Sequence, residues 1–134
     1  MLVSQDVIRR EILYIKDKMP SPTKTLIEQL VQFGLNDNRT VIVEGILSTP
    51  KYGKLLHRLA GEAPHSSVYY FDIPFEETLR RHATKPNAHE FGEAEMKRWW
   101  IANDFLGITG EKTIDETMQK DEIVAMILQE LEYK

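Results

Sequence analysis

The sequence contains no cysteine among its 134 residues, which excludes disulfide bonds, thiolate metal sites and a cysteine nucleophile. It also lacks any apolar run close to the roughly 20 residues that a membrane helix needs. Its start, MLVSQDVIRREIL, shows no basic flank followed by an apolar signal core. These absences predict a cytoplasmic protein with no membrane partner.

An excess of positive charge is also missing. Lys and Arg number 17 against 21 Asp and Glu, so the formal net charge is −4. Because nucleic-acid backbones are bound mainly by clustered Lys and Arg, we expect no general nucleic-acid binding, although a local basic patch for a small anion remains open. The histidines are His57, His65, His82 and His89. None has a partner at HExxH or H-x₃-H spacing, so we expect no metal site.

What is present is the composition of a globular protein, with 42% hydrophobic and 28% charged residues. The length is that of one ordinary domain and too short for two independent cores. We therefore predict a single domain over residues 1–134.

Strands and helices alternate along the first half. Residues 1–4 form a short apolar run that predicts a strand. Apolar side chains then recur at helical spacing at Ile8, Ile12, Ile15 and Met19, which predicts a helix entered just after Asp6. Ser21 and Pro22 open a second predicted helix, with Gly34 at its C-terminal cap. Residues 40–43 are β-branched and continuous and end at Glu44, as expected for a strand buried on both faces.

The alternation continues to the end of the chain. A helical stripe contains Tyr52, Leu55, Leu56 and Leu59. Residues 68–71 predict another strand, ending at Asp72, and Pro74 suits the first turn of a following helix. Residues 83–95 are polar and predict a loop or lid, and a short helix is expected over 96–103. A last strand at 113–114 and a helix around 123–131 complete a predicted parallel α/β fold.

Three carboxylates follow the three clear strands: Asp6, Glu44 and Asp72. In an open parallel sheet the ligand crevice lies beyond the carboxyl ends of the strands. Carboxylates placed there can take a proton from a hydroxyl group or hold Mg²⁺, as phosphoryl transfer requires. The alternative is that Asp6 caps the helix that follows it, and for Asp72 capping before Pro74 is the favoured interpretation.

Cations gather in the segment EETLRRHATK, which contains Arg80, Arg81, His82 and Lys85. Arginines there can bind phosphate bidentately, and ordinary complementation of the helix dipole is the alternative. Arg9 and Arg10 have the same two interpretations. Trp99 and Trp100 can stack on a base, but adjacent tryptophans on a helix point in different directions, so we expect one in the core and one partly exposed.

Several segments together resemble a known family. SQDVIRREIL, TVIVEGIL, VYYFDIPFEETLRRHATKP and HEFGEAEMKRWW, in this order, resemble bacterial P-loop kinases related to the zeta-toxin and polynucleotide-kinase-like group, in an AAA-type kinase subgroup. The resemblance runs from about Met1 to the C-terminal helix. It implies a three-layer α/β fold with a parallel sheet, and an ATP-dependent phosphotransferase acting on a small-molecule or nucleotide hydroxyl, with ATP and Mg²⁺ as cofactors.

The resemblance also implies roles for individual residues. Asp6 resembles the base that accepts the proton of the acceptor hydroxyl. Arg9 or Arg10 would then help to seat the acceptor, and Glu44 resembles the carboxylate near the metal or acceptor site. Arg80 and Arg81 resemble the arginines that lead into the lid and reach the donor phosphates. Lys85 and Arg98 are further candidates for cofactor contact. The lid corresponds to about residues 82–100.

The chain departs from this family at the phosphate-binding loop. No glycine is followed by Lys-Ser or Lys-Thr, so the G-x-x-x-x-G-K-[ST] motif does not occur. The predicted fold is thus a P-loop kinase-like fold without its first, central strand and loop, and we expect no activity from this chain alone. Two strands would then lack a partner, which predicts a homodimer, a swapped strand or rearranged pairing. The alternative function is a non-catalytic, kinase-derived binding or interaction module.

Overall fold

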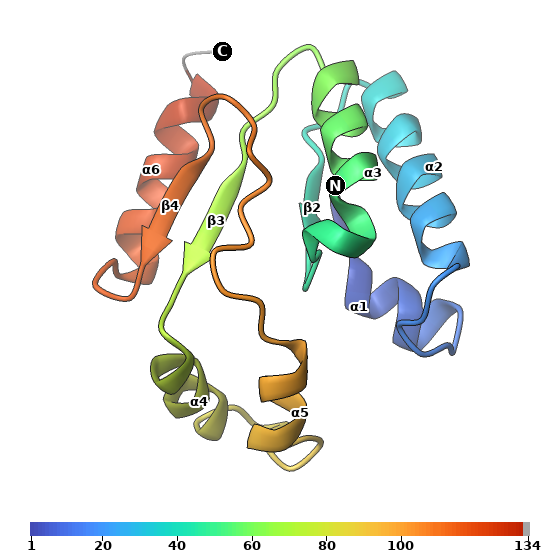
Figure 1. Ribbon diagram of the computed structural model, residues 1–134. Helices are drawn as coiled ribbons and strands as arrows, with labels where there is room; N and C mark the ends of the chain where they lie inside the picture. Colours follow the sequence, from blue (N-terminus) through green and yellow to red (C-terminus); the bar gives the residue numbers. More distant parts are fainter. Residues whose placement is uncertain (133–134) are drawn as a thin grey trace. The chain divides into compact units, whose positions relative to one another are not determined.

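The computed structural model describes residues 1–132 and divides into two compact units, Met1–Ser66 and Ser67–Lys134. The first contains β1 (Leu2–Ser4), α1 (Gln5–Val7), the π-helix η1 (Ile8–Ile12), α2 (Pro22–Asn36), β2 (Ile42–Glu44) and α3 (Thr49–Glu62). The second contains β3 (Tyr69–Asp72), α4 (Phe75–Ala83), α5 (Glu93–Trp99), β4 (Lys112–Asp115) and α6 (Lys120–Glu132) (Figure 1). The α/β class is confirmed, with short strands in two small parallel sheets. The single domain stays a prediction.

The first unit has a parallel sheet of β1 and β2. Leu2 pairs with Ile42, Val3 with Val43 and Ser4 with Glu44. Both strands lie where the apolar runs predict them. The prediction that β2 is buried on both faces is wrong, because Ile42 is 56% exposed and Leu2 beside it is 64% exposed. The apolar core of this unit lies against the other face, which carries Val3.

The first helix is shorter than its apolar spacing predicts. It passes from α1 into η1, where the Leu13 amide donates to the Ile8 carbonyl at 2.9 Å, and it ends at Ile12. Tyr14 has a left-handed φ of 53°, a conformation that a right-handed helix does not contain. The predicted continuation to Met19 is therefore wrong, and residues 13–20 form an irregular connection.

Helix α2 begins as predicted and ends later than predicted. The Ser21 hydroxyl accepts a hydrogen bond from the Thr23 amide at 3.2 Å, and Pro22 occupies the first turn. Gly34 was expected as the C-terminal cap, but the helix continues to Asn36. A Cβ at Gly34 would lie 2.5 Å from Val41 Cγ2. This glycine therefore allows close packing of the helix, which its position in the sequence does not distinguish from a cap.

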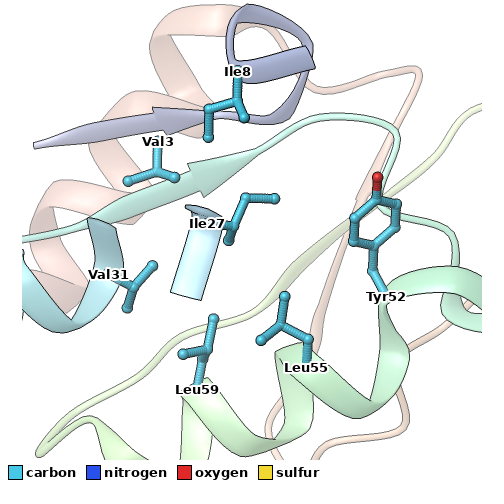
Figure 2. Packing of buried hydrophobic residues seen from close by; sticks show 7 residues of the cluster. All are labelled: Val3, Ile8, Ile27, Val31, Tyr52, Leu55 and Leu59. Atoms are coloured by element: carbon cyan, nitrogen blue, oxygen red, sulfur yellow. The ribbon is translucent and has the colours of Figure 1, made fainter. Parts of the chain in front are cut away.

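The apolar core of the first unit is formed by side chains from its sheet and from its helices. It contains Val3, Ile8, Ile27, Val31, Tyr52, Leu55 and Leu59. Figure 2 shows these side chains converging from β1, η1, α2 and α3. The stripe predicted on α3 is confirmed, since Tyr52 is fully buried and Leu55 and Leu59 are nearly so. The Tyr52 ring packs in the core while its hydroxyl points away from Leu55 and Leu59.

The second unit has a parallel sheet of β3 and β4. Tyr69 pairs with Lys112, Tyr70 with Thr113, Phe71 with Ile114 and Asp72 with Asp115. Both predicted strands are confirmed to within a residue or two at their ends, and Ile114 is fully buried. On α6, Glu130 accepts hydrogen bonds from the Tyr69 and Ser67 hydroxyls and forms a salt bridge with Lys112 at 2.8 Å. The predicted C-terminal helix is thus confirmed and is tied to the sheet.

Helix α5 begins and ends earlier than predicted. The Glu95 carboxylate accepts a hydrogen bond from the Gly92 amide at 3.0 Å, which caps the helix start. Trp100 has a ψ of 126°, which is extended backbone and ends the helix. The prediction of a core tryptophan is wrong, because Trp99 is 45% and Trp100 37% exposed. Each makes an edge contact instead, Trp99 with Phe91 and Trp100 with Phe75.

Within residues 1–132, no helix combines the length and apolar character needed to cross a bilayer.

Candidate functional site

The predicted strand-end carboxylates fall at two separate sheet edges, one in each unit. In the first unit, Ser4 and Glu44 are register partners, and Asp6 follows two residues after Ser4 in α1. In the second unit, Asp72 pairs with Asp115 at the end of β4. Sequence reasoning missed Asp115, although its place after the apolar residues of a short strand repeats the pattern of Asp72.

The capping interpretations of these acids are wrong. Ser4, not Asp6, occupies the N-cap position of α1, and Pro74, not Asp72, occupies that of α4. Asp6 lies inside its helix, so its carboxylate is not used to cap it. Asp6 thus lies just after the carboxyl end of β1, as predicted.

Asp6 forms an ion pair with Arg9. Arg9 Nη2 donates to Asp6 Oδ1 at 2.8 Å, and the Asp6 side chain remains 51% exposed. A second guanidinium nitrogen, Nη1, donates to the Ile15 carbonyl at 3.4 Å. Arg9 Nε is buried without a hydrogen-bond partner among the described residues. Arg9 is thus bound by both the Asp6 carboxylate and the Ile15 carbonyl, and it orients that carboxylate. The neighbouring Arg10 is exposed.

A polar network supports the residue that precedes Asp6. Gln5, only 2% exposed, donates from Nε2 to the Tyr52 hydroxyl at 3.1 Å. The hydroxyl donates to Asp17 Oδ1 at 2.9 Å, and Lys51 Nζ donates to Asp17 Oδ2 at 2.7 Å. Burial, with the Asp17 carboxylate as a further cause, raises the pKa of Tyr52 to about 12. The network therefore links the end of β1 to the connection 13–20 and to α3.

Gly45 completes this end of the sheet. Its φ is +142°, and a Cβ there would lie 2.7 Å from Gln5 Cβ. The residue after Glu44 must therefore be glycine for the Gln5 side chain to reach Tyr52. Sequence reasoning missed Gln5, Asp17, Lys51 and the polar role of Tyr52, because the spacing of Tyr52 indicated only a core position.

The predicted arginines of α4 converge on one carboxylate in the second unit. Arg80 donates to Glu77 through Nε at 2.6 Å and Nη2 at 2.7 Å. Arg81 Nε donates to Glu77 Oε1 at 2.7 Å, and its Nη2 donates to the Glu116 carbonyl at 3.0 Å. Hydrogen bonds from Arg80 and then Arg81 lower the pKa of Glu77 to about 2. The two guanidinium groups thus already bind a carboxylate.

The other predicted cofactor contacts make local interactions. Lys85 follows α4, and its amide donates to the His82 carbonyl at 3.0 Å. Arg98 lies on α5 and pairs with Glu95 at 3.3 Å while 70% exposed. At the start of the predicted lid, His82 Nε2 is 2.9 Å from the Phe91 carbonyl and its ring stacks on Phe91. The function of residues 82–100 as a lid stays a prediction.

ATP and Mg²⁺, the cofactors that the resemblance implies, require a phosphate-binding loop and oxygen ligands for the metal ion. Among residues 1–132, no group of three or more His, Cys, Asp or Glu side chains is arranged to hold a metal ion. The sequence offers no G-x-x-x-x-G-K-[ST] loop for the phosphates of ATP. Within residues 1–132 there is thus neither a group of this kind for a metal ion nor a loop of this kind for phosphates.

The chain matches none of the family models, curated proteins or solved structures with which it was compared. The kinase resemblance therefore stays a hypothesis based on the quoted segments.

Proposed function

We propose that the chain derives from P-loop phosphotransferases and carries the acceptor side of such an active site, which takes the hydroxyl of a small molecule or nucleotide. The strand pairing supports this most: β1 pairs with β2 and β3 with β4, both in parallel. In the family that the sequence resembles, the first strand lies between the counterparts of β2 and β3. The same two outer pairs are therefore expected. A cytoplasmic location is part of the proposal.

The end of β1 supplies the chemistry in this proposal. Asp6 is half exposed, so an acceptor hydroxyl can reach it, and Arg9 fixes one of its oxygens. In a complete active site, a carboxylate oriented in this way would accept the proton of the hydroxyl as the hydroxyl oxygen bonds to the γ-phosphorus of ATP and ADP leaves. Arg9, Arg10 and Glu44 seat the acceptor, and Gln5 holds the backbone of Asp6 through Tyr52.

The donor side is not complete in this chain. ATP and Mg²⁺ supply the phosphoryl group and its charge neutralisation in the family, but the loop that cradles them does not occur here. Phosphoryl transfer depends almost wholly on positioning and electrostatics. We therefore expect no phosphate transfer from these 134 residues alone, and reading the encoding DNA upstream of Met1 for an in-frame G-x-x-x-x-G-K-[ST] is a direct check on the lineage.

Calorimetric titration with Mg-ATP tests the proposed division of roles. We expect no heat of binding at millimolar nucleotide for the wild-type chain. Binding at micromolar concentration would contradict the expectation of an incomplete donor site. In that case Asp6→Asn should abolish phosphate transfer and leave nucleotide binding unchanged, while Asp37→Asn, at an exposed acid paired with Arg39, should change neither. Transfer by Asp6→Asn would exclude Asp6 as the base.

The second candidate is an interaction module, and exposed strands favour it. β2 pairs with β1 only, and β3 with β4 only, among the described residues. A free strand edge is a template for pairing with another chain. The apolar pair Leu2 and Ile42 is exposed beside one of these edges. This arrangement supports a homodimer or a swapped strand.

Sedimentation of an Ile42→Lys variant tests this second candidate. If β2 pairs with its copy about a twofold axis, the two introduced lysines bring like charges to the interface. The dissociation constant of the dimer should then rise by at least about tenfold. Phe33→Lys is the matched control, because Phe33 is 60% exposed on α2, and it should leave the dimer intact. A wild-type chain that is monomeric at high micromolar concentration would contradict the dimer.

A further inference from the structure

One carboxylate on α4 is bound by the two arginines to which the family resemblance gives a phosphate contact. Glu77 lies in the first turn of the helix, and the two arginines lie in its last turn. Arg80 binds the carboxylate through two nitrogens and Arg81 through one, at 2.6–2.7 Å. A guanidinium fork binds carboxylate and phosphate in the same geometry. The bound Glu77 carboxylate therefore shows that the cluster of Arg80 and Arg81 accepts an oxyanion.

The cluster is accessible and partly preorganised. The side chain of Arg80 is 68% exposed and that of Arg81 41%, whereas that of Glu77 is 21% exposed. Arg81 is also anchored to the Glu116 carbonyl at 3.0 Å. This second bond does not involve Glu77, so Arg81 keeps its orientation when the carboxylate leaves. An anion arriving from solvent thus meets the arginines first.

We propose that Glu77 is a built-in competitor at an oxyanion site formed by Arg80 and Arg81, and that the phosphate group of a ligand binds by displacing its carboxylate. The inference rests on the proposed kinase lineage, from which the resemblance implies that these arginines contact phosphate. It adds that the site is closed by Glu77 in the absence of ligand. A phosphate dianion has the advantage of greater charge, and the displaced carboxylate is left exposed to water.

The expected size of the competition follows from the weakness of exposed helical ion pairs. Each pair at this spacing shifts an equilibrium by about twofold. Removing two pairs, together with the negative charge beside the incoming anion, should tighten phosphate binding about fivefold. The carboxylate is therefore a modest competitor for an incoming anion.

The test is titration of the whole chain with inorganic phosphate and with pyrophosphate at constant ionic strength, followed by the NMR signals of the arginine Nε–H groups. Glu77→Gln is expected to bind both anions about fivefold more tightly than the wild type. Glu76→Gln removes the same charge from the adjacent, exposed residue and should change the affinity less than twofold. Adding Arg81→Gln to Glu77→Gln should abolish the gain.

Two results would overturn the inference. Equal tightening by Glu76→Gln and Glu77→Gln would show that general charge is responsible. No binding of pyrophosphate to Glu77→Gln at tens of millimolar would show that the arginines are ordinary surface partners of Glu77. Circular dichroism melting of each variant ensures that the comparison is between folded chains. Tighter pyrophosphate binding by Glu77→Gln, together with upstream DNA that encodes no in-frame G-x-x-x-x-G-K-[ST], would support the competitor while leaving the kinase lineage without support.

Discussion

Replacing Gly45 with alanine is expected to lower the free energy of unfolding by about 2–4 kcal/mol. The backbone at this residue has a φ of +142°, a region open to glycine and strained for residues with a side chain. The added Cβ would also lie 2.7 Å from Gln5 Cβ. Because Gln5 is buried and bonded to Tyr52, it cannot move aside without breaking that hydrogen bond.

The matched control for this change is Gly61→Ala. Gly61 lies within α3 and has open space where its Cβ would be. Alanine there should raise the free energy of unfolding by at most about 0.5–1 kcal/mol, because Gly61 is the penultimate residue of the helix and glycine costs most in a helix interior. Urea denaturation measures both changes. Loss of less than 1 kcal/mol on Gly45→Ala would mean that the end of β2 relaxes freely, and that Gly45 does not hold Gln5 in place.

Replacing Tyr52 with phenylalanine is expected to lower the free energy of unfolding by about 1–3 kcal/mol. The ring still fills the core, so the loss comes from the hydroxyl alone. The Gln5 amide loses its acceptor in a buried setting, and Asp17 loses a donor at 2.9 Å. Tyr14→Phe is the control, since Tyr14 is 83% exposed and surface changes are usually within about 0.5 kcal/mol.

A double-mutant cycle isolates the buried bond between Tyr52 and Gln5. Replacing both partners by apolar groups, Tyr52→Phe with Gln5→Met, should cost less than the sum of the single changes, because no polar group is then left unpaired. The coupling should be at least about 0.5 kcal/mol. Strict additivity would mean that the two side chains do not depend on each other and that the network does not position Asp6.

Ultraviolet absorbance provides a second measurement of the same hydroxyl. Burial raises the pKa of both Tyr52 and Tyr69 to about 12, so Tyr52→Phe should remove one of the two tyrosines within residues 1–132 whose pKa is raised. The unfolded chain loses these protons from about pH 10. The folded chain holds them longer, so stability should fall as pH rises from about 10 to 12, and the fall should be smaller in the variant.

The elements that could be predicted are those whose signal is local. A continuous β-branched or aromatic run predicts β2 and β3, and a Ser-Pro start predicts α2. The apolar stripe of α3 was correct because the core it packs against is made by the same unit. Local patterns gave the wrong helix ends where contacts with other parts of the chain determine them. Gly34 lies inside α2 and Val41 packs against it. Residues 13–19 carry helical spacing, but the helix ends at Ile12.

The candidate site divides in the same way. The sequence by itself determined that acids follow the strands and that two arginines end α4, because strand ends and helix turns are set by neighbours in the chain. The spacing from Glu77 to Arg81 also falls within one helix and contained the signal for their pairing. Only the tertiary structure decided that Gln5 meets Tyr52, 47 residues away, since that contact depends on how α3 packs into the shared core and on the space that Gly45 leaves open.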